Sequence, residues 1–113
     1  MAHDAELAER VRAAVRAEEN VREVRMFGGL AFMVDEKMVA CVSGGGGGLL
    51  VRVSRSRDAQ YLERVGARRA EMGGRSMGEG WITVDDEALT EDSGLQFWID
   101  AVLEYNAEIT AQR

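Results

Sequence analysis

Between residues 24 and 53, apolar side chains recur at every second position, and only short breaks separate the runs. The runs cover residues 24–34, 37–43 and 49–53, and the breaks are Asp35-Glu36 and five consecutive glycines at 44–48. A period of two predicts β-strands, and strands joined by so few residues have to be antiparallel. This half of the chain is therefore restricted to an antiparallel sheet.

The rest of the chain alternates between helical and strand periods. Leu7, Val11 and Val15 predict a helix over residues 4–18, and similar spacings predict helices over 56–65 and from Ser93 onward. Short strands are expected at 70–72 and 81–85. Amphipathic helices need a sheet face to bury their apolar side, so we predict an α+β fold. It is a two-layer sandwich of order α-β3-α-β2-α, an antiparallel sheet covered by helices, with Trp81 and Trp98 largely buried.

Two glycine features interrupt the predicted sheet. Gly28-Gly29 lies inside the first apolar run, where glycine weakens a strand, and we expect a β-bulge or a close backbone approach there. The run at 44–48 is followed by a strand, whereas a phosphate-binding loop requires a helix after its glycines. We therefore expect this run to be a flexible, dispensable hairpin tip without phosphate chemistry.

The length of 113 residues suits one domain, which we place at 1–113. The first residues interleave acids and bases and lack the apolar run of a secretory signal, which favours the cytoplasm. The one cysteine, Cys41, allows no internal disulfide and is expected to be buried and unreactive. No segment is apolar over the length needed to cross a bilayer, so we expect no membrane contact.

The residue types needed for catalysis are sparse. The one histidine, His3, precedes the first predicted helix, and there is no histidine or cysteine pair to bind zinc. The acids at 85–87 and 91–92 could hold a divalent cation, but such acids commonly serve as solvated charges at loop and helix starts. We expect no enzyme activity, no catalytic residue, no metal and no cofactor.

Charge is unevenly distributed along the chain. Residues 52–75 hold seven arginines and three acids, a net +4, and the overall charge of -6 leaves -10 for the remainder. The basic segment supports one alternative function, a nucleic-acid-binding accessory domain, although the acidic remainder would repel a duplex. The residues of this candidate nucleic-acid surface are Arg55, Arg57, Arg64, Arg68 and Arg69.

Several short motifs resemble one family when they are taken in order. Residues 25–32 (RMFGGLAF), 37–40, 49–53, 74–78 (GRSMG) and 80–84 (GWITV) are similar to the N-terminal domain of TfoX/Sxy competence regulators. The resemblance implies the same α-β3-α-β2-α order and a regulatory module, because full-length members promote expression of DNA-uptake genes. The candidate motif residues, which we expect to be mostly structural, are Met26, Phe27, Gly28, Gly29, Arg75 and Trp81.

Protein–protein interaction is the function that we expect first. Helices on one face of the sheet would leave the other face partly open, and Met33, Met38, Met72 and Met77 would suit an adaptable apolar contact. We therefore expect a non-enzymatic regulatory module with a protein partner, of the kind found in transcriptional regulators. A homodimer formed by this face is also expected, and nucleic acid is the less favoured partner.

Overall fold

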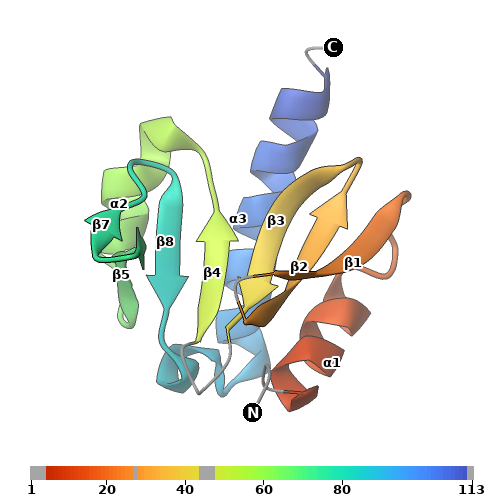
Figure 1. Cartoon of the computed structure of the whole chain (residues 1–113), viewed down its shortest axis with the longest axis horizontal. Coiled ribbons are helices and arrows are strands. Elements are labelled where there is room, and N and C mark those ends of the chain that lie inside the picture. Colours follow the sequence, from red (N-terminus) through yellow and green to blue (C-terminus); the bar gives the residue numbers. More distant parts are fainter. Residues whose placement is uncertain (1–4, 27, 44–47, 112–113) are drawn as a thin grey trace.

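The computed structural model describes residues 5–26, 28–43 and 48–111. A six-stranded antiparallel sheet forms its centre, in the order β1-β2-β3-β4-β8-β5. A separate pair, β6 and β7, forms a small hairpin beside it (Figure 1). The strands are β1 Val21–Met26, β2 Gly29–Val34, β3 Lys37–Val42, β4 Leu49–Arg52, β5 Ala67–Arg69, β6 Glu71–Met72, β7 Arg75–Ser76 and β8 Trp81–Val84.

The helices gather on one face of the sheet. The long helix α3 (Asp92–Ala111) runs behind β3 and β4 in Figure 1 and packs against both, and α1 (Ala5–Ala14) packs against α3. The short helix α2 (Asp58–Leu62) follows a 3₁₀ turn, η1 (Arg55–Arg57), and contacts β5 and β8. A second 3₁₀ turn, η2 (Asp86–Leu89), leads into α3. The α+β class and the antiparallel sheet are confirmed.

The main core lies between the sheet and these helices. Phe32, Leu49 and Ile82 from three strands meet Trp98 and Ile99 of α3, and all five side chains are almost completely buried. The ring of Trp98 also lies 5.7 Å from that of Tyr61 on α2 and 5.2 Å from that of Phe97, between centroids. The buried position predicted for Trp98 is therefore correct. Trp81, by contrast, is only partly buried and lies in a second, smaller cluster.

The first predicted strand is two strands, so four strands precede α2 where three were expected. β1 pairs with β2 from Val21↔Val34 to Met26↔Gly29. The alternation continues through both strands without a change of period, which concealed the reversal. Gly28 stands in the connection with a φ of +75°, a conformation that favours glycine. Gly28 belongs to a turn, and the irregularity in the sheet lies instead in the pairing of β2 with β3, where the register shifts between Phe32 and Met33.

The close approach expected at this glycine pair is found at Gly29. A Cβ added to Gly29 would lie 2.3 Å from the carbonyl oxygen of Val42 on β3. Gly48 is similarly restricted, because it has a φ of +80° and an added Cβ would lie 2.2 Å from the carbonyl oxygen of Val84. The last glycine of the run is thus packed against the sheet, where a side chain would not fit. Residues 44–47 lie outside the described residues, so the flexible, dispensable hairpin tip stays a prediction.

Two shorter elements also differ from expectation. The helix predicted over 56–65 is helical only at Asp58–Leu62, and Val65, expected on its apolar side, is 90% exposed. Gly66 reverses the chain directly afterwards with a φ of +85°, so the helix has no room to extend. The strand expected at 70–72 is present only as β6, and β5 and β7 were not expected, so four strands lie between α2 and α3 where two were predicted. Within the described residues, none of the helices combines the length and apolar character needed to span a bilayer.

Candidate functional site

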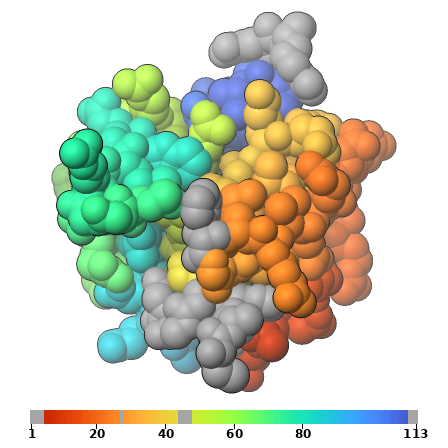
Figure 2. Space-filling model, in the orientation of Figure 1, coloured from red at the N-terminus to blue at the C-terminus, as the bar shows by residue number. Residues whose placement is uncertain are grey.

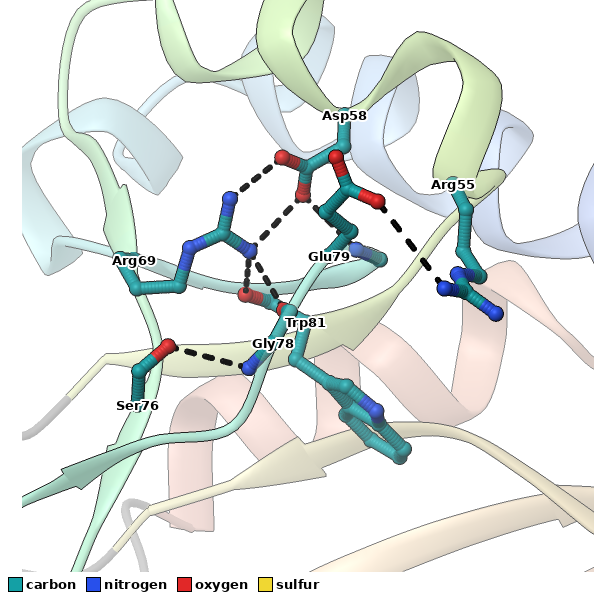
Figure 3. A network of polar contacts seen from close by, with 8 residues as sticks. Arg55, Asp58, Arg69, Ser76, Gly78, Glu79 and Trp81 are labelled. Atoms are coloured by element: carbon teal, nitrogen blue, oxygen red, sulfur yellow. Dashed lines mark hydrogen bonds and ion pairs between the residues drawn. The ribbon is translucent and has the colours of Figure 1, made fainter.

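A buried ion pair holds the loop that leads into β8. Asp58 is the first residue of α2, its side chain is 4% exposed, and Arg69 reaches it from β5 (Figure 3). The guanidinium donates two hydrogen bonds to the carboxylate, and the Nη1–Oδ1 distance is 2.9 Å. The same Nη1 donates to the carbonyl oxygens of Gly78, at 2.5 Å, and Trp81, at 3.1 Å. One arginine therefore joins three segments of the chain.

The loop completes the coordination of the carboxylate. The backbone N–H of Gly80 donates to Asp58 Oδ1 at 2.8 Å, and Gly80 itself has a φ of +92°. The hydrogen bonds from Arg69 lower the pKa of Asp58; burial acts in the opposite direction and is outweighed, with the Gly80 amide adding to the lowering. Asp58 is therefore a charged group whose hydrogen bonds with Arg69 and Gly80 fix the loop.

The structure places the five arginines of the predicted nucleic-acid surface in different settings. Arg57 on η1 pairs with Glu104 of α3 at 2.6 Å, and Arg55 lies 4.0 Å from Glu79. Arg68 pairs with Asp85 at 2.8 Å.

Arg64 lies over the ring of Phe97, 3.5 Å from its centroid. Because Arg68 and Arg69 are neighbours on one strand, their side chains leave it on opposite faces, and Arg69 is committed to Asp58. The five do not form a single basic cluster.

A hollow of about 270 Å³ lies at the end of the sheet where β4 finishes and β8 begins. Arg52 from β4 extends into it, with its guanidinium carbon 5.3 Å from the ring centroid of Trp81 and 5.5 Å from that of Tyr105 on α3. Met77, Arg55 and the loop residues up to Gly80 complete the wall.

Sequence analysis did not single out Arg52 or Tyr105 as site residues. Each fitted a regular pattern, Arg52 as an outward residue of a strand and Tyr105 as part of the apolar side of the last helix. An arginine between Val51 and Val53 was the one available signal.

The face of the sheet away from the helices carries a second apolar cluster. Ala31, Cys41, Leu50 and Ala70 are buried in it, and burial raises the pKa of the Cys41 thiol. Five side chains that are only partly buried pack around them: Met26, Met33, Met38, Met77 and Trp81. We call these nine residues the open-face cluster. Three of the four methionines proposed for an apolar contact belong to it, whereas Met72 is exposed on β6.

A comparison with protein-family profiles matches residues 3–105 to the TfoX N-terminal domain. The chain belongs to this family. The search of curated proteins returned no match. The match covers most of the structure described above, from α1 into α3. It confirms the resemblance inferred from the motifs.

The candidate motif residues of this TfoX N-terminal domain have mainly architectural surroundings. Met26 ends β1 within the open-face cluster, Gly28 and Gly29 form the turn and the close approach, and Phe27 lies outside the described residues. Arg75 is exposed on β7, and no described aromatic ring or carboxylate contacts it. Trp81 belongs to both the open-face cluster and the lining of the Arg52 hollow.

The acids considered for a cation do not assemble. Within residues 5–26, 28–43 and 48–111, no three His, Cys, Asp or Glu side chains come together in a group that could hold a metal ion. Asp85 instead pairs with Arg68, and Asp92 pairs with Arg10 at 3.3 Å. His3 lies outside the described residues.

Proposed function

We propose that this TfoX N-terminal domain is a non-enzymatic regulatory module of the cytoplasm that acts by binding another protein through the open-face cluster. Family membership supports a regulatory domain in general terms. The observation that carries the proposal is the asymmetry of the sheet, since the three helices pack on one face (Figure 1) and the open-face cluster occupies the other. Figure 2 shows the surface of the molecule from the side of the strands, with the residues of β1 to β3 in orange and yellow. Regulation of transcription would then be exerted through the bound protein.

The chemistry of this face indicates the kind of partner. The register places Arg22 opposite Met33, and Arg68 opposite Thr83, so both arginines lie on the side of the open-face cluster. Arg52 is opposite Trp81 and begins on the same side. The one acid in the six strands, Glu23, points the other way and bonds Arg12 of α1. Glu36 and Asp85 already pair with Arg22 and Arg68, so Arg52 is the one of these three arginines left to attract an acid. The face therefore suits a partner segment that combines apolar side chains with an acidic one.

Two other partners are less well supported by these contacts. A second copy of the chain, docked face to face, would enclose the Arg52 of each copy, which has no acidic partner among the described residues of its own chain, in an interface whose strand positions supply no acid. The homodimer expected from the sequence stays an untested prediction. The nucleic-acid alternative also stays untested, and the pairing of Arg57, Arg68 and Arg69 with acids gives it no added support.

Photo-crosslinking from a defined position tests the proposal. Met38, partly buried in the open-face cluster, is replaced by p-benzoylphenylalanine, and the matched control carries the same residue at Val65, which is 90% exposed elsewhere. Cells expressing each variant are irradiated, and the crosslinked peptide is identified by mass spectrometry. We expect the variant at position 38, but not the one at position 65, to crosslink to a protein segment with apolar and acidic residues. Adding Met33→Glu to the position 38 variant should abolish this crosslink.

The outcomes separate the alternatives. Identical products from positions 38 and 65 would refute the open face as the binding surface. A crosslink between two copies of the chain would establish self-association. A crosslink to DNA or RNA would favour the nucleic-acid function. The melting temperature of each purified variant, measured by circular dichroism, confirms that a lost crosslink does not reflect unfolding.

A further inference from the structure

The hollow at the end of the sheet contains an arginine without an acidic partner. Arg52 is partly buried, and no described carboxylate lies within 4.0 Å of its guanidinium, whereas Arg55, Arg57, Arg68 and Arg69 each have one. The Arg52 guanidinium lies instead against the rings of Trp81 and Tyr105. Aromatic rings hold a guanidinium over their faces without using its N–H donors. Those donors stay available to an anion.

The surroundings limit the charge of a suitable anion. Arg55 forms the rim of the hollow beside Glu79, at a separation of 4.0 Å, and both side chains are well exposed. Such a pair holds its geometry weakly, so Arg55 can turn toward a bound anion. Arg52, Arg55 and Glu79 together give the hollow a formal charge of +1. That value matches a monoanion better than a dianion such as a phosphate monoester.

The remaining walls favour an apolar group next to the charge. Met77, Trp81 and Tyr105 line the hollow together with the backbone of Gly78 and Gly80. Gly80 is held by Asp58 and by Val53, whose N–H donates to its carbonyl oxygen at 2.8 Å, so this wall is fixed before any ligand arrives. A volume of about 270 Å³ accommodates a single ring with a carboxylate. Fixed walls reduce the entropy lost on binding.

We propose that this hollow is a binding site for a small organic monocarboxylate with a flat apolar ring. The carboxylate accepts a forked pair of hydrogen bonds from Arg52, and Arg55 contributes from the rim. The ring lies against Met77 and the edges of Trp81 and Tyr105. The hollow adjoins the open-face cluster and shares Met77 and Trp81 with it, whereas Tyr105 and Arg55 lie outside that cluster, so the variants at Arg55 test the ligand site separately from the proposed protein-binding function.

Titration with simple probes tests this site by nuclear magnetic resonance. The probes are benzoate, its neutral isostere benzamide, and phenyl phosphate, and the signal is the indole N–H of Trp81, assigned with Trp81→Phe. We expect benzoate to bind with a Kd on the order of 1 mM, as suits so small a ligand. Benzamide should bind at least tenfold more weakly, and phenyl phosphate no more tightly than benzoate.

Variants then locate the binding. Arg52→Gln should weaken benzoate at least tenfold, whereas Arg64→Gln, which removes another arginine lying over a ring, should leave it unchanged. Arg55→Glu reverses the charge of the rim at an exposed position, so it should weaken benzoate severalfold without affecting the fold.

Three results would overturn the proposal: equal affinity for benzamide and benzoate, equal effects of Arg52→Gln and Arg64→Gln, or tighter binding of phenyl phosphate. A thermal melt of each variant identifies any that fails to fold. If Arg52→Gln does not fold, the effect of Arg55→Glu on benzoate affinity tests the proposal in its place.

Discussion

The role of Asp58 in the structure differs from the role that its neighbours in the sequence suggest. Asp58 stands among arginines in the +4 segment, where an exposed acid that moderates the local charge would be the ordinary interpretation. In the structure, its carboxylate is buried and accepts hydrogen bonds from Arg69 and Gly80, which are 11 and 22 residues away. No local pattern encodes contacts at such separations. The sequence therefore could not distinguish Arg69, a structural arginine, from its exposed neighbour Arg68.

The pH dependence of stability should expose the Asp58–Arg69 pair. Asp58→Asn is expected to reduce the free energy of unfolding at pH 7 by about 2 to 3 kcal/mol, less than for a fully buried pair because Arg69 is 26% exposed. The folded pKa of Asp58 lies below the ordinary value of 3.8. The charged carboxylate thus stabilises the fold above that value, and its contribution is lost as the pH falls through the folded pKa.

Urea denaturation at several pH values measures this contribution. The difference between wild type and Asp58→Asn should be constant from pH 7 to about 5 and should shrink below about pH 4. Asp100→Asn, at an exposed position on α3, is the control and should show little difference at any pH. A difference for Asp58→Asn that stays constant into strong acid would contradict the ion pair.

The two tryptophans should differ in their effect on stability. Trp98 is 2% exposed and touches Tyr61 and Phe97, so Trp98→Ala should lower the free energy of unfolding by about 3 to 5 kcal/mol. Trp81 is only partly buried, and Trp81→Ala should cost about half as much. Denaturant midpoints of the two variants, compared with wild type, check the order. Equal losses would mean that Trp81 is buried as deeply as Trp98.

At the scale of elements, the apolar period identified the helices and the sheet but not where the chain turns. The residues of β1 and β2 follow one alternating pattern, so sequence analysis joined them into a single strand. Likewise, the spacing of Ala59, Leu62 and Val65 suggested a longer α2 than the five residues observed. In both cases glycine conformation decided the boundary, at Gly28 and Gly66, and a single sequence does not report φ.

The β1–β2 turn provides a test of these glycine assignments. Gly29→Ala should destabilise the protein by about 2 to 3 kcal/mol, because the new Cβ would lie 2.3 Å from the Val42 carbonyl oxygen and force two backbones apart. Gly28→Ala meets no atom within 4 Å and should cost only about 1 kcal/mol for its left-handed φ. Thermal denaturation of both variants tests the ranking. A larger loss of stability for Gly28→Ala than for Gly29→Ala would mean that the close backbone approach is not at Gly29.

At the scale of the whole molecule, the sequence indicated an open sheet face and its methionines but not the charge around them. Met33, Met38 and Met77 could be predicted because strand alternation assigns residues to faces. The pairing of each arginine could not, because it depends on how distant acids such as Glu104 and Asp85 are brought near. That Arg52 differs from Arg55, Arg57, Arg68 and Arg69 in having no described acid within 4.0 Å emerges only once those four pairs are known.

The oligomeric state of the purified chain follows from the same distribution of charge. The open face is the surface on which a homodimer was expected, yet its strand positions carry Arg22, Arg52 and Arg68 and no acid. Glu36 and Asp85 already pair with Arg22 and Arg68 within the chain, so a two-fold pair would leave the Arg52 of each copy in one interface without an acid to balance it. We therefore expect the isolated chain to be a monomer of 12.4 kDa.

Sedimentation equilibrium over a hundredfold range of concentration, at low and moderate salt, measures that mass. A constant monomer mass at both salt concentrations is the expected result, and Arg52→Gln serves as the matched variant because it removes the unbalanced charge. If charge repulsion is what prevents pairing, Arg52→Gln should associate more readily than wild type at low salt, where repulsion is screened least. A wild-type dimer that persists in moderate salt would contradict the charge argument and support the homodimer predicted from the sequence. Such an interface should bury more than about 1,000 Å² in total, an area that the apolar part of the open face would have to supply.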